Sequence, residues 1–259
     1  MKHIKQHFIL LLSVLLFSCS FLHAKKGAPA QITRLDQLTK KVYVSIEALS
    51  TFNFWQNLQK PYGNDGIIFC VTPSIRVDYY LGSYFFFGGG FSYNTTGGKY
   101  YFPSSRINDL PHLSSEIDAS RRVSVSYIEM PLYIKVQSNY INNWAVQGLI
   151  GFSWGVKIRS LYSDVYYNVK YTNDAGAVLF NGHTYTEEGN FGKKASLWNV
   201  GALAEIRALY RATEKLQLFV GAGYQAGLTN TLSKKNMTTE DGFHKGKPGQ
   251  VIVSAGLVF

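Results

Sequence analysis

A strict alternation of apolar and polar positions runs through residues 144–159 of this 259-residue chain. Apolar residues and one glycine hold the even positions from Trp144 to Ile158, whereas Gln147, Lys157 and Arg159 fall on odd ones. An amphipathic helix would repeat its apolar face every three to four residues, so this period of two predicts a β-strand. Residues 127–137 repeat the alternation, and the polar segment between the two stretches predicts a turn.

The same alternation predicts about six further strands, near residues 42–49, 69–79, 85–93, 198–207, 216–226 and 251–259. Most of these segments reach the roughly ten residues that a tilted strand needs to cross a bilayer. Short connections after Tyr80, Gln137 and Tyr210 alternate with long polar ones near 51–66, 95–122, 160–195 and 230–248. Residues 41–259 are therefore predicted to form an all-β domain, an eight-stranded antiparallel up-and-down transmembrane β-barrel with short turns on its periplasmic side.

The apolar face of the predicted strands is expected on the outside of the barrel, whereas a soluble barrel buries its apolar face inside. The apolar face is the bulkier and more aromatic one, in a chain with 15% aromatic and only 16% charged residues. We therefore expect it to face lipid, with charges of mixed sign inside pairing across strands and plugging the lumen. Glu129 could alternatively serve as a proton donor. The predicted polar network comprises Glu47, Arg76, Asp78, Glu129, Lys135, Lys157, Glu205 and Arg207.

The first 24 residues have the pattern of a secretory signal peptide. A basic start precedes the apolar run Phe8–Phe17, which is too short to span a bilayer, and Ala24 offers a cleavage site. A rival cleavage before Cys19 would leave a lipid-modified cysteine. Residues 25–40 then form a short periplasmic segment. Either way the mature chain leaves the cytoplasm, which argues against nucleic acid as a partner despite the net charge of +10 and favours the outer membrane.

Aromatic residues near the predicted strand ends suggest interfacial belts. The expected members are Tyr79, Tyr140, Trp144 and Tyr210 near the short turns, and Trp55, Tyr93, Trp154 and Trp198 near the long connections. The terminal Phe259 is in phase with Leu257 and Val253, and is predicted to be the signal read by the barrel-insertion machinery.

The segment YIEMPLYIKV, residues 127–136, followed by a turn and a Gly-rich strand, resembles the PorT-like outer-membrane β-barrel family of Bacteroidota. The residues that carry the resemblance are Tyr127, Ile128, Glu129, Met130 and Pro131. The resemblance implies a barrel in the cell outer membrane, with proteins of a secretion apparatus as expected partners.

No pattern for catalysis, a cofactor or a metal ion stands out. No Glu-x-x-His motif occurs, and His112, His183 and His244 fall in predicted loops. The leading hypothesis is a non-enzymatic barrel acting as an anchor, a secretion or assembly accessory, or a surface-loop interaction protein. The alternatives are a lipid-modifying enzyme built on Ser160, His112 and His183, a narrow channel, and a soluble β-sandwich or lipocalin-like carrier. Outer-membrane lipids, including lipopolysaccharide, are expected partners of the basic loop residues Lys193, Lys194, Lys234, Lys235, His244, Lys245 and Lys247.

Overall fold

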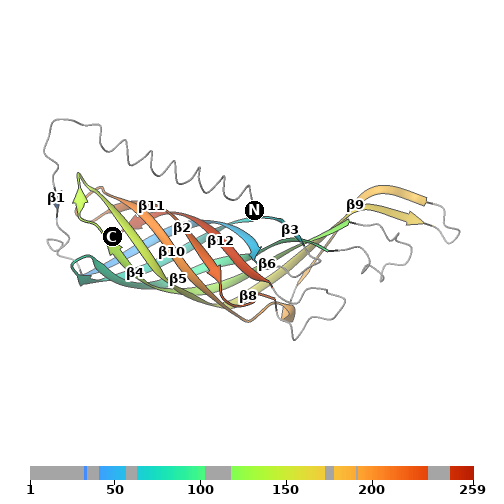
Figure 1. Cartoon of the computed structure of the whole chain (residues 1–259), viewed down its shortest axis with the longest axis horizontal. Coiled ribbons are helices and arrows are strands. Elements are labelled where there is room, and N and C mark those ends of the chain that lie inside the picture. The colour runs from blue at the N-terminus through green and yellow to red at the C-terminus, as the bar shows by residue number, and fades with distance from the viewer. Residues whose placement is uncertain are drawn as a thin grey trace. The chain divides into compact units, whose positions relative to one another are not determined.

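The fold is that of a computed structural model (Figure 1), which describes residues 32–33, 41–56, 63–102, 118–172, 178–190, 192–232 and 246–259. The chain divides into two units, Met1–Ile32 and Thr33–Phe259. The second unit holds the fold described below. The predicted leader with Cys19 lies outside the described residues, as do His112, His244, Lys234, Lys235 and Lys245.

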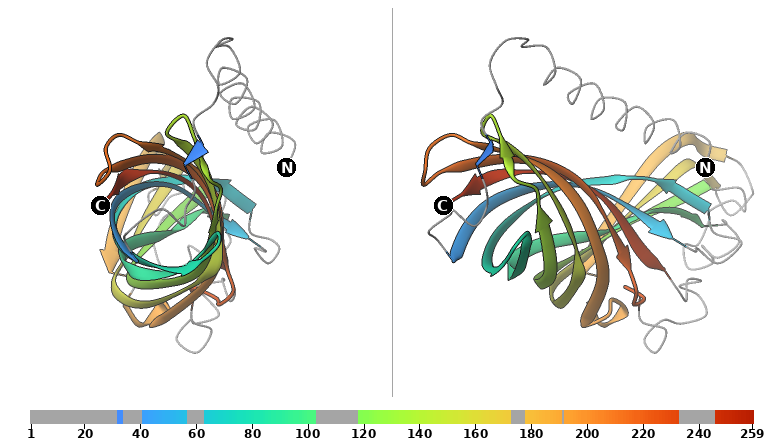
Figure 2. Two further views of the ribbon diagram at one scale, coloured as in Figure 1. Left: turned by 90° about the vertical axis from the view of Figure 1, so that its left-hand side faces the viewer. Right: turned by 60° about the vertical axis from the view of Figure 1, so that its left-hand side comes forward.

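Eight antiparallel strands close into a barrel, as the sequence predicts. Each strand pairs with the next in the chain, and the last pairs with the first, so the sheet forms a ring (Figure 2, left). The strands are β2 (Val42–Gln56), β4 (Ile68–Gly82), β5 (Phe85–Phe102), β6 (Asp118–Gln137), β8 (Trp144–Thr172), β10 (Trp198–Arg211), β11 (Gln217–Gly227) and β12 (Lys247–Val258).

Four shorter strands and a 3-10 turn complete the described structure. They are β1 (Ile32–Thr33), β3 (Gly63–Gly66), β7 (Tyr140–Ile141), β9 (Val178–Asn190) and η3 (Gly192–Lys194). β3 pairs with β5, and β9 pairs with the distal half of β8. Within the described part of the chain, no helix is long and apolar enough to cross a membrane.

Exposure alternates along the strands with the predicted period of two and the predicted orientation. On β8, Ile150 is 68% and Phe152 63% exposed, whereas Gln147, Leu149 and Ser153 are buried inside the barrel. Since neighbouring strands pair in register, the outward residues form one continuous apolar band around the barrel. A slip of one residue would exchange that band for the polar interior.

The long connections were only partly predicted. The three short turns lie where expected, but β5 continues to Phe102, β6 begins at Asp118 and β8 runs to Thr172. Where the structure describes the expected loops at 95–122 and 160–195, most of their residues are therefore strand, β9 included. These extensions project beyond the other strands at the long-connection end (Figure 1). The prediction failed because the outward face is no longer apolar there: Val123 and Val125 are buried in the interior, whereas Arg122 is exposed, although main-chain pairing continues.

A β-bulge changes the phase of β8 where the extension begins. Tyr127 pairs with Lys157 and Ser126 with Arg159, so Ile158 is an extra residue without a partner on β6. A bulge of this kind redirects the side chains that follow it. Arg159, which the alternation placed inside the barrel, is exposed on the outer wall.

Six of the eight aromatic residues expected in the belts are exposed on the outside of the barrel. Outside the barrel, the rings of Trp144 and Tyr210 are 4.9 Å apart near the short turns, and Trp154 stacks on Trp198 at 4.9 Å near the long connections. Tyr79 and Tyr93 are also exposed. The prediction is wrong for Tyr140 and Trp55, which are buried in the two interior apolar clusters at the barrel ends.

Candidate functional site: the layered barrel interior

The inward side chains of β2 pass through successive layers of different chemistry. Tyr43 lies at the short-turn end, followed by Ser45 and Glu47, then Leu49, then Thr51 and Asn53, and finally Trp55 at the long-connection end. β10 runs the opposite way and repeats the order, with Asn199, Leu203, Glu205, Arg207 and Leu209. The interior therefore consists of an apolar end cluster, a charged layer, an apolar layer, an amide layer and a second apolar end cluster.

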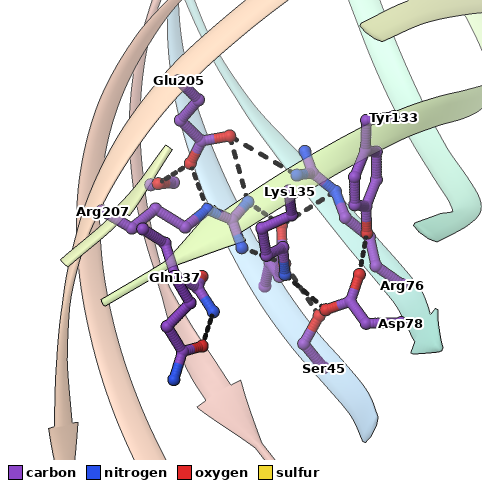
Figure 3. Close-up of polar contacts among 11 residues, drawn as sticks. Ser45, Arg76, Asp78, Tyr133, Lys135, Gln137, Glu205 and Arg207 are labelled. Atoms are coloured by element: carbon purple, nitrogen blue, oxygen red, sulfur yellow. Dashed lines mark hydrogen bonds and ion pairs between the residues drawn. The ribbon is translucent and has the colours of Figure 1, made fainter. Parts of the chain in front are cut away.

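Two arginines and two glutamates form the centre of the charged layer, and all four are buried. Arg207 donates from Nη1 and Nη2 to Glu47 at 2.8 and 3.0 Å, and from Nε and Nη2 to Glu205 at 2.7 and 3.0 Å. Arg76 Nε lies 3.1 Å from Glu47 Oε2, and Arg76 Nη1 lies 3.4 Å from Glu205 Oε2. The four formal charges cancel, and each carboxylate contacts both guanidinium groups (Figure 3).

A second ion pair, between Lys135 and Asp78, extends this layer across the lumen. Tyr133 donates its hydroxyl to Asp78 Oδ1 at 2.8 Å, and its ring lies 5.3 Å from the Arg76 guanidinium (Figure 3). Gly88 leaves the room that these groups occupy, because a Cβ there would lie 2.3 Å from both Asp78 Oδ1 and the Tyr133 ring. A small residue on the inner face thus accommodates the long ones.

Glu129 lies in the amide layer, and it accepts hydrogen bonds from neutral side chains. Asn199 Nδ2 donates to its Oε1 at 2.9 Å and Gln225 Nε2 to its Oε2 at 3.2 Å, while Gln225 also reaches Ser153 Oγ at 2.8 Å. The expected pairing with a lysine or arginine is therefore replaced by bonds from amides. A cavity of about 10 Å³, room for one water molecule, lies beside Glu129.

Lys157 is the predicted network residue that lies apart from the buried charges. It is only partly buried, and its Nζ donates to the backbone carbonyl oxygens of Gly192 and Ala195, each at 2.7 Å. It therefore fastens the η3 turn to the barrel wall and does not pair with a carboxylate in the lumen. The bulge at Ile158 begins directly after it, so Lys157 marks the end of the regular alternation.

The structure describes no contact between the residues of the lipid-modifying enzyme hypothesis. Ser160 is buried and donates to Asn190 Oδ1 and the Gly192 carbonyl oxygen at 3.4 Å each. His112 is outside the described residues, and only the backbone of His183, in β9, is described. Among the described residues, no three His, Cys, Asp or Glu side chains are grouped to hold a metal ion.

A bidentate ion pair ties β6 to β8 in the extension, outside the apolar band. Arg121 Nε and Nη2 donate to the two carboxylate oxygens of Asp164, both at 2.6 Å, and the guanidinium lies 5.2 Å from the Tyr162 ring. Burial alone would lower the pKa of Arg121, but the hydrogen bonds with Asp164 and the neighbouring Tyr100 raise it above its usual value. The guanidinium therefore stays charged, which keeps the two strands joined.

Sequence reasoning did not single out several polar residues that complete the layers. Ser45 donates to Glu47 Oε1 at 2.8 Å, and Ser254 donates to Glu205. Asn199 and Gln225 supply the donors to Glu129. Their inward phase on β2, β12, β10 and β11 was available from the alternation, but nothing in the sequence says which strands meet across the lumen.

Comparison with known proteins agrees with this geometry. The family model described as "Outer membrane protein beta-barrel domain" matches residues 34–233. The chain belongs to this family. The protein is therefore located in the outer membrane, as the sequence predicts. No match was found among curated proteins.

Solved structures with a similar fold have distant sequences. Neisserial surface protein A (NspA) is 11% identical, with a TM-score of 0.36 over 85% of this chain and 96% of that one. The outer membrane protein OprG from Pseudomonas aeruginosa is 8% identical, with a TM-score of 0.41 over 84% and 94%. The outer membrane protease OmpT from Escherichia coli is 12% identical, with a TM-score of 0.42 over 90% and 99%.

Proposed function

We propose that this protein is a non-enzymatic outer-membrane barrel that displays a rigid sheet beyond the membrane as a docking surface for another protein. The observation that carries the proposal is the continuation of β5, β6 and β8 past the apolar band. These strands have 18, 20 and 29 residues, whereas about ten suffice to cross the apolar core. On β8, the part beyond Ile158 amounts to about 45 Å of extended chain.

The displayed sheet has features that suit a binding platform. It is ordered by main-chain pairing of β3, β5, β6, β8 and β9 and by the Arg121–Asp164 ion pair. In the described structure, β9 pairs with β8 along one edge and β3 pairs with β5 along one edge. Their outer edges present main-chain groups that an extended segment of a partner can pair with.

A closed lumen supports display over transport. The charged layer spans the barrel and is covered by an apolar cluster at either end. An ion entering it would have to displace side chains that already satisfy one another. We therefore expect no steady conductance when the purified protein is added to planar bilayers. Regular single-channel steps would favour the narrow channel instead.

The resemblance of residues 127–136 to PorT-like proteins supports a more specific version of the proposal. In that version, the displayed sheet belongs to a secretion or assembly apparatus, and its partner is another envelope protein. The anchoring role is then that of the apolar band, and the interaction role is that of the extension.

Shortening the extension tests the proposal directly. We would replace residues 165–186 by an Asn-Gly turn, which joins β8 and β9 and leaves the membrane part of the barrel intact. A strain lacking the protein would be complemented with the full or the shortened chain. Display predicts that the shortened chain inserts, shown by heat-dependent gel migration, yet fails to complement. Full complementation would refute the display role and would place the function in the barrel.

A further inference from the structure

We propose that the outer wall of β5, β6 and β8 binds the phosphate groups of an outer-leaflet lipid, with Arg159, Arg122 and Lys99 as its cations. This goes beyond the display role, since it concerns the wall that continues the lipid-facing surface and depends only on the barrel lying in an outer membrane. None of the three residues belongs to the polar network inside the barrel.

The bulge at Ile158 aims Arg159 at this wall. Without the extra residue, Arg159 would follow Lys157 into the lumen side of β8. With it, Arg159 is exposed outside, directly after Ile158, which is also exposed. A bulge interrupts main-chain pairing and redirects the side chains that follow it. This one lies at the end of the apolar band, where it turns a charged side chain outward.

Arg159 shares its row with two hydroxyl groups. It pairs across the strands with Ser126, which pairs in turn with Thr95, and the two hydroxyl oxygens are 2.9 Å apart. A guanidinium beside two hydroxyls offers several donors to the oxygens of one phosphate group. Arginine suits this task because its fork of N–H groups matches two oxygens at once.

Two more cations face outward farther along the same strands. Lys99 on β5 is the direct partner of Arg122 on β6, and their neighbours Gly98 and Val123 contact the interior. Like charges in such a pair repel each other unless an anion lies between them. Neither has an ion pair among the described residues. Along this row, Arg122 pairs with Ser163 of β8, and Ser163 pairs with Glu188 of β9. The acid Glu188 therefore lies two strands away from Arg122.

The depth of the three cations fits a lipid headgroup. The last exposed aromatic and apolar positions below them are Tyr93, Ile128, Ile158 and Trp198. Arg122 precedes Ser126 by four residues, about 13 Å along the strand. At a tilt of about 40° this is about 10 Å of depth, which spans the headgroup region above the aromatic belt.

Lipid retention measured by native mass spectrometry tests the site. The full mature chain in detergent would be titrated with bisphosphorylated lipid A, and the variant Lys99→Gln/Arg122→Gln/Arg159→Gln compared with the unchanged protein. A cation near an anionic membrane surface contributes about fivefold in binding, so we expect the triple variant to bind about a hundredfold more weakly. Added salt should weaken binding to the unchanged protein more than to the variant.

The control variant, Lys41→Gln/Arg211→Gln/Lys215→Gln, removes three positive charges at the short-turn end. It should bind lipid A like the unchanged protein. Equal loss in both variants, or no loss in the first, would overturn the proposal. Inorganic phosphate competing as well as lipid A would overturn the lipid assignment. Should the first triple variant not insert, Arg159→Gln alone carries the same test, with an expected fivefold loss.

Discussion

Replacing Arg207 by methionine removes the residue on which the charged layer depends most. The change deletes four hydrogen bonds of 2.7–3.0 Å to Glu47 and Glu205, while leaving a side chain of similar length. The cluster of two arginines and two glutamates then carries a net charge of −1 in a buried site. Breaking a buried pair from one side costs about 3–5 kcal/mol, because the remaining charge is left without compensation.

Urea unfolding in lipid vesicles, followed by tryptophan fluorescence and by heat-dependent gel migration, would measure this cost. Arg211→Met is the matched control, since Arg211 is four residues along β10 and partly exposed, and it should cost less than about 0.5 kcal/mol. Adding Glu205→Gln to Arg207→Met restores neutrality and should recover part of the loss. A cost below about 1 kcal/mol for Arg207→Met, or a larger loss in the double variant, would refute the reasoning.

Three further predictions concern packing, lipid contact and the extension. Gly88→Ala, whose Cβ would meet an interior carboxylate and ring at 2.3 Å, should lower the free energy of unfolding by about 1–3 kcal/mol, whereas Gly148→Ala, with nothing within 4 Å, should not. Ile150→Arg in the apolar band should cost about 2–4 kcal/mol and Leu197→Arg near the interface about 0–1, both read from urea unfolding. Asp164→Asn should speed proteolysis of the extension while heat-dependent migration of the barrel is kept; unchanged proteolysis would show that the ion pair does not order the extension.

The period of two was enough to predict the barrel because membrane strands are constrained on both faces. A residue such as Ile150 must meet lipid and its neighbour Leu149 must fit the lumen, so a single phase holds over the whole span. The same phase would have placed Trp55 inside, since the outward residues of β2 are the even ones. Its nearness to a long connection suggested a belt residue instead, and the alternation was the better guide.

The parts that failed lie where this constraint ends. Beyond the apolar band, β8 and β9 still pair through their main chains, but the outward positions no longer carry the apolar residues by which the strands were predicted, as the exposed Arg159 shows. The bulge at Ile158 also has no signal in the sequence, because the extra residue is recognised only from the pairing of Arg159 with Ser126. Sequence alone therefore placed Arg159 on the wrong side of the wall.

The candidate site was predictable as a set of inward residues but not as a set of contacts. Glu129 on β6 receives its hydrogen bonds from Asn199 on β10 and Gln225 on β11, which are 70 and 96 residues away in the chain. Closure of the barrel decides which strands meet. Local spacing could therefore indicate that the lumen is polar, but it could not distinguish an ion pair from an amide cage.

The central claim is that bulky apolar side chains face lipid while charged and amide groups fill a closed interior. A photoreactive probe confined to the acyl chains, followed by mass spectrometry of the labelled residues, tests it most directly. The account predicts labels on Ile150, Phe152 and Val220 and none on Gln147 or Glu205. Labels on the latter two, with the first three unmarked, would contradict it.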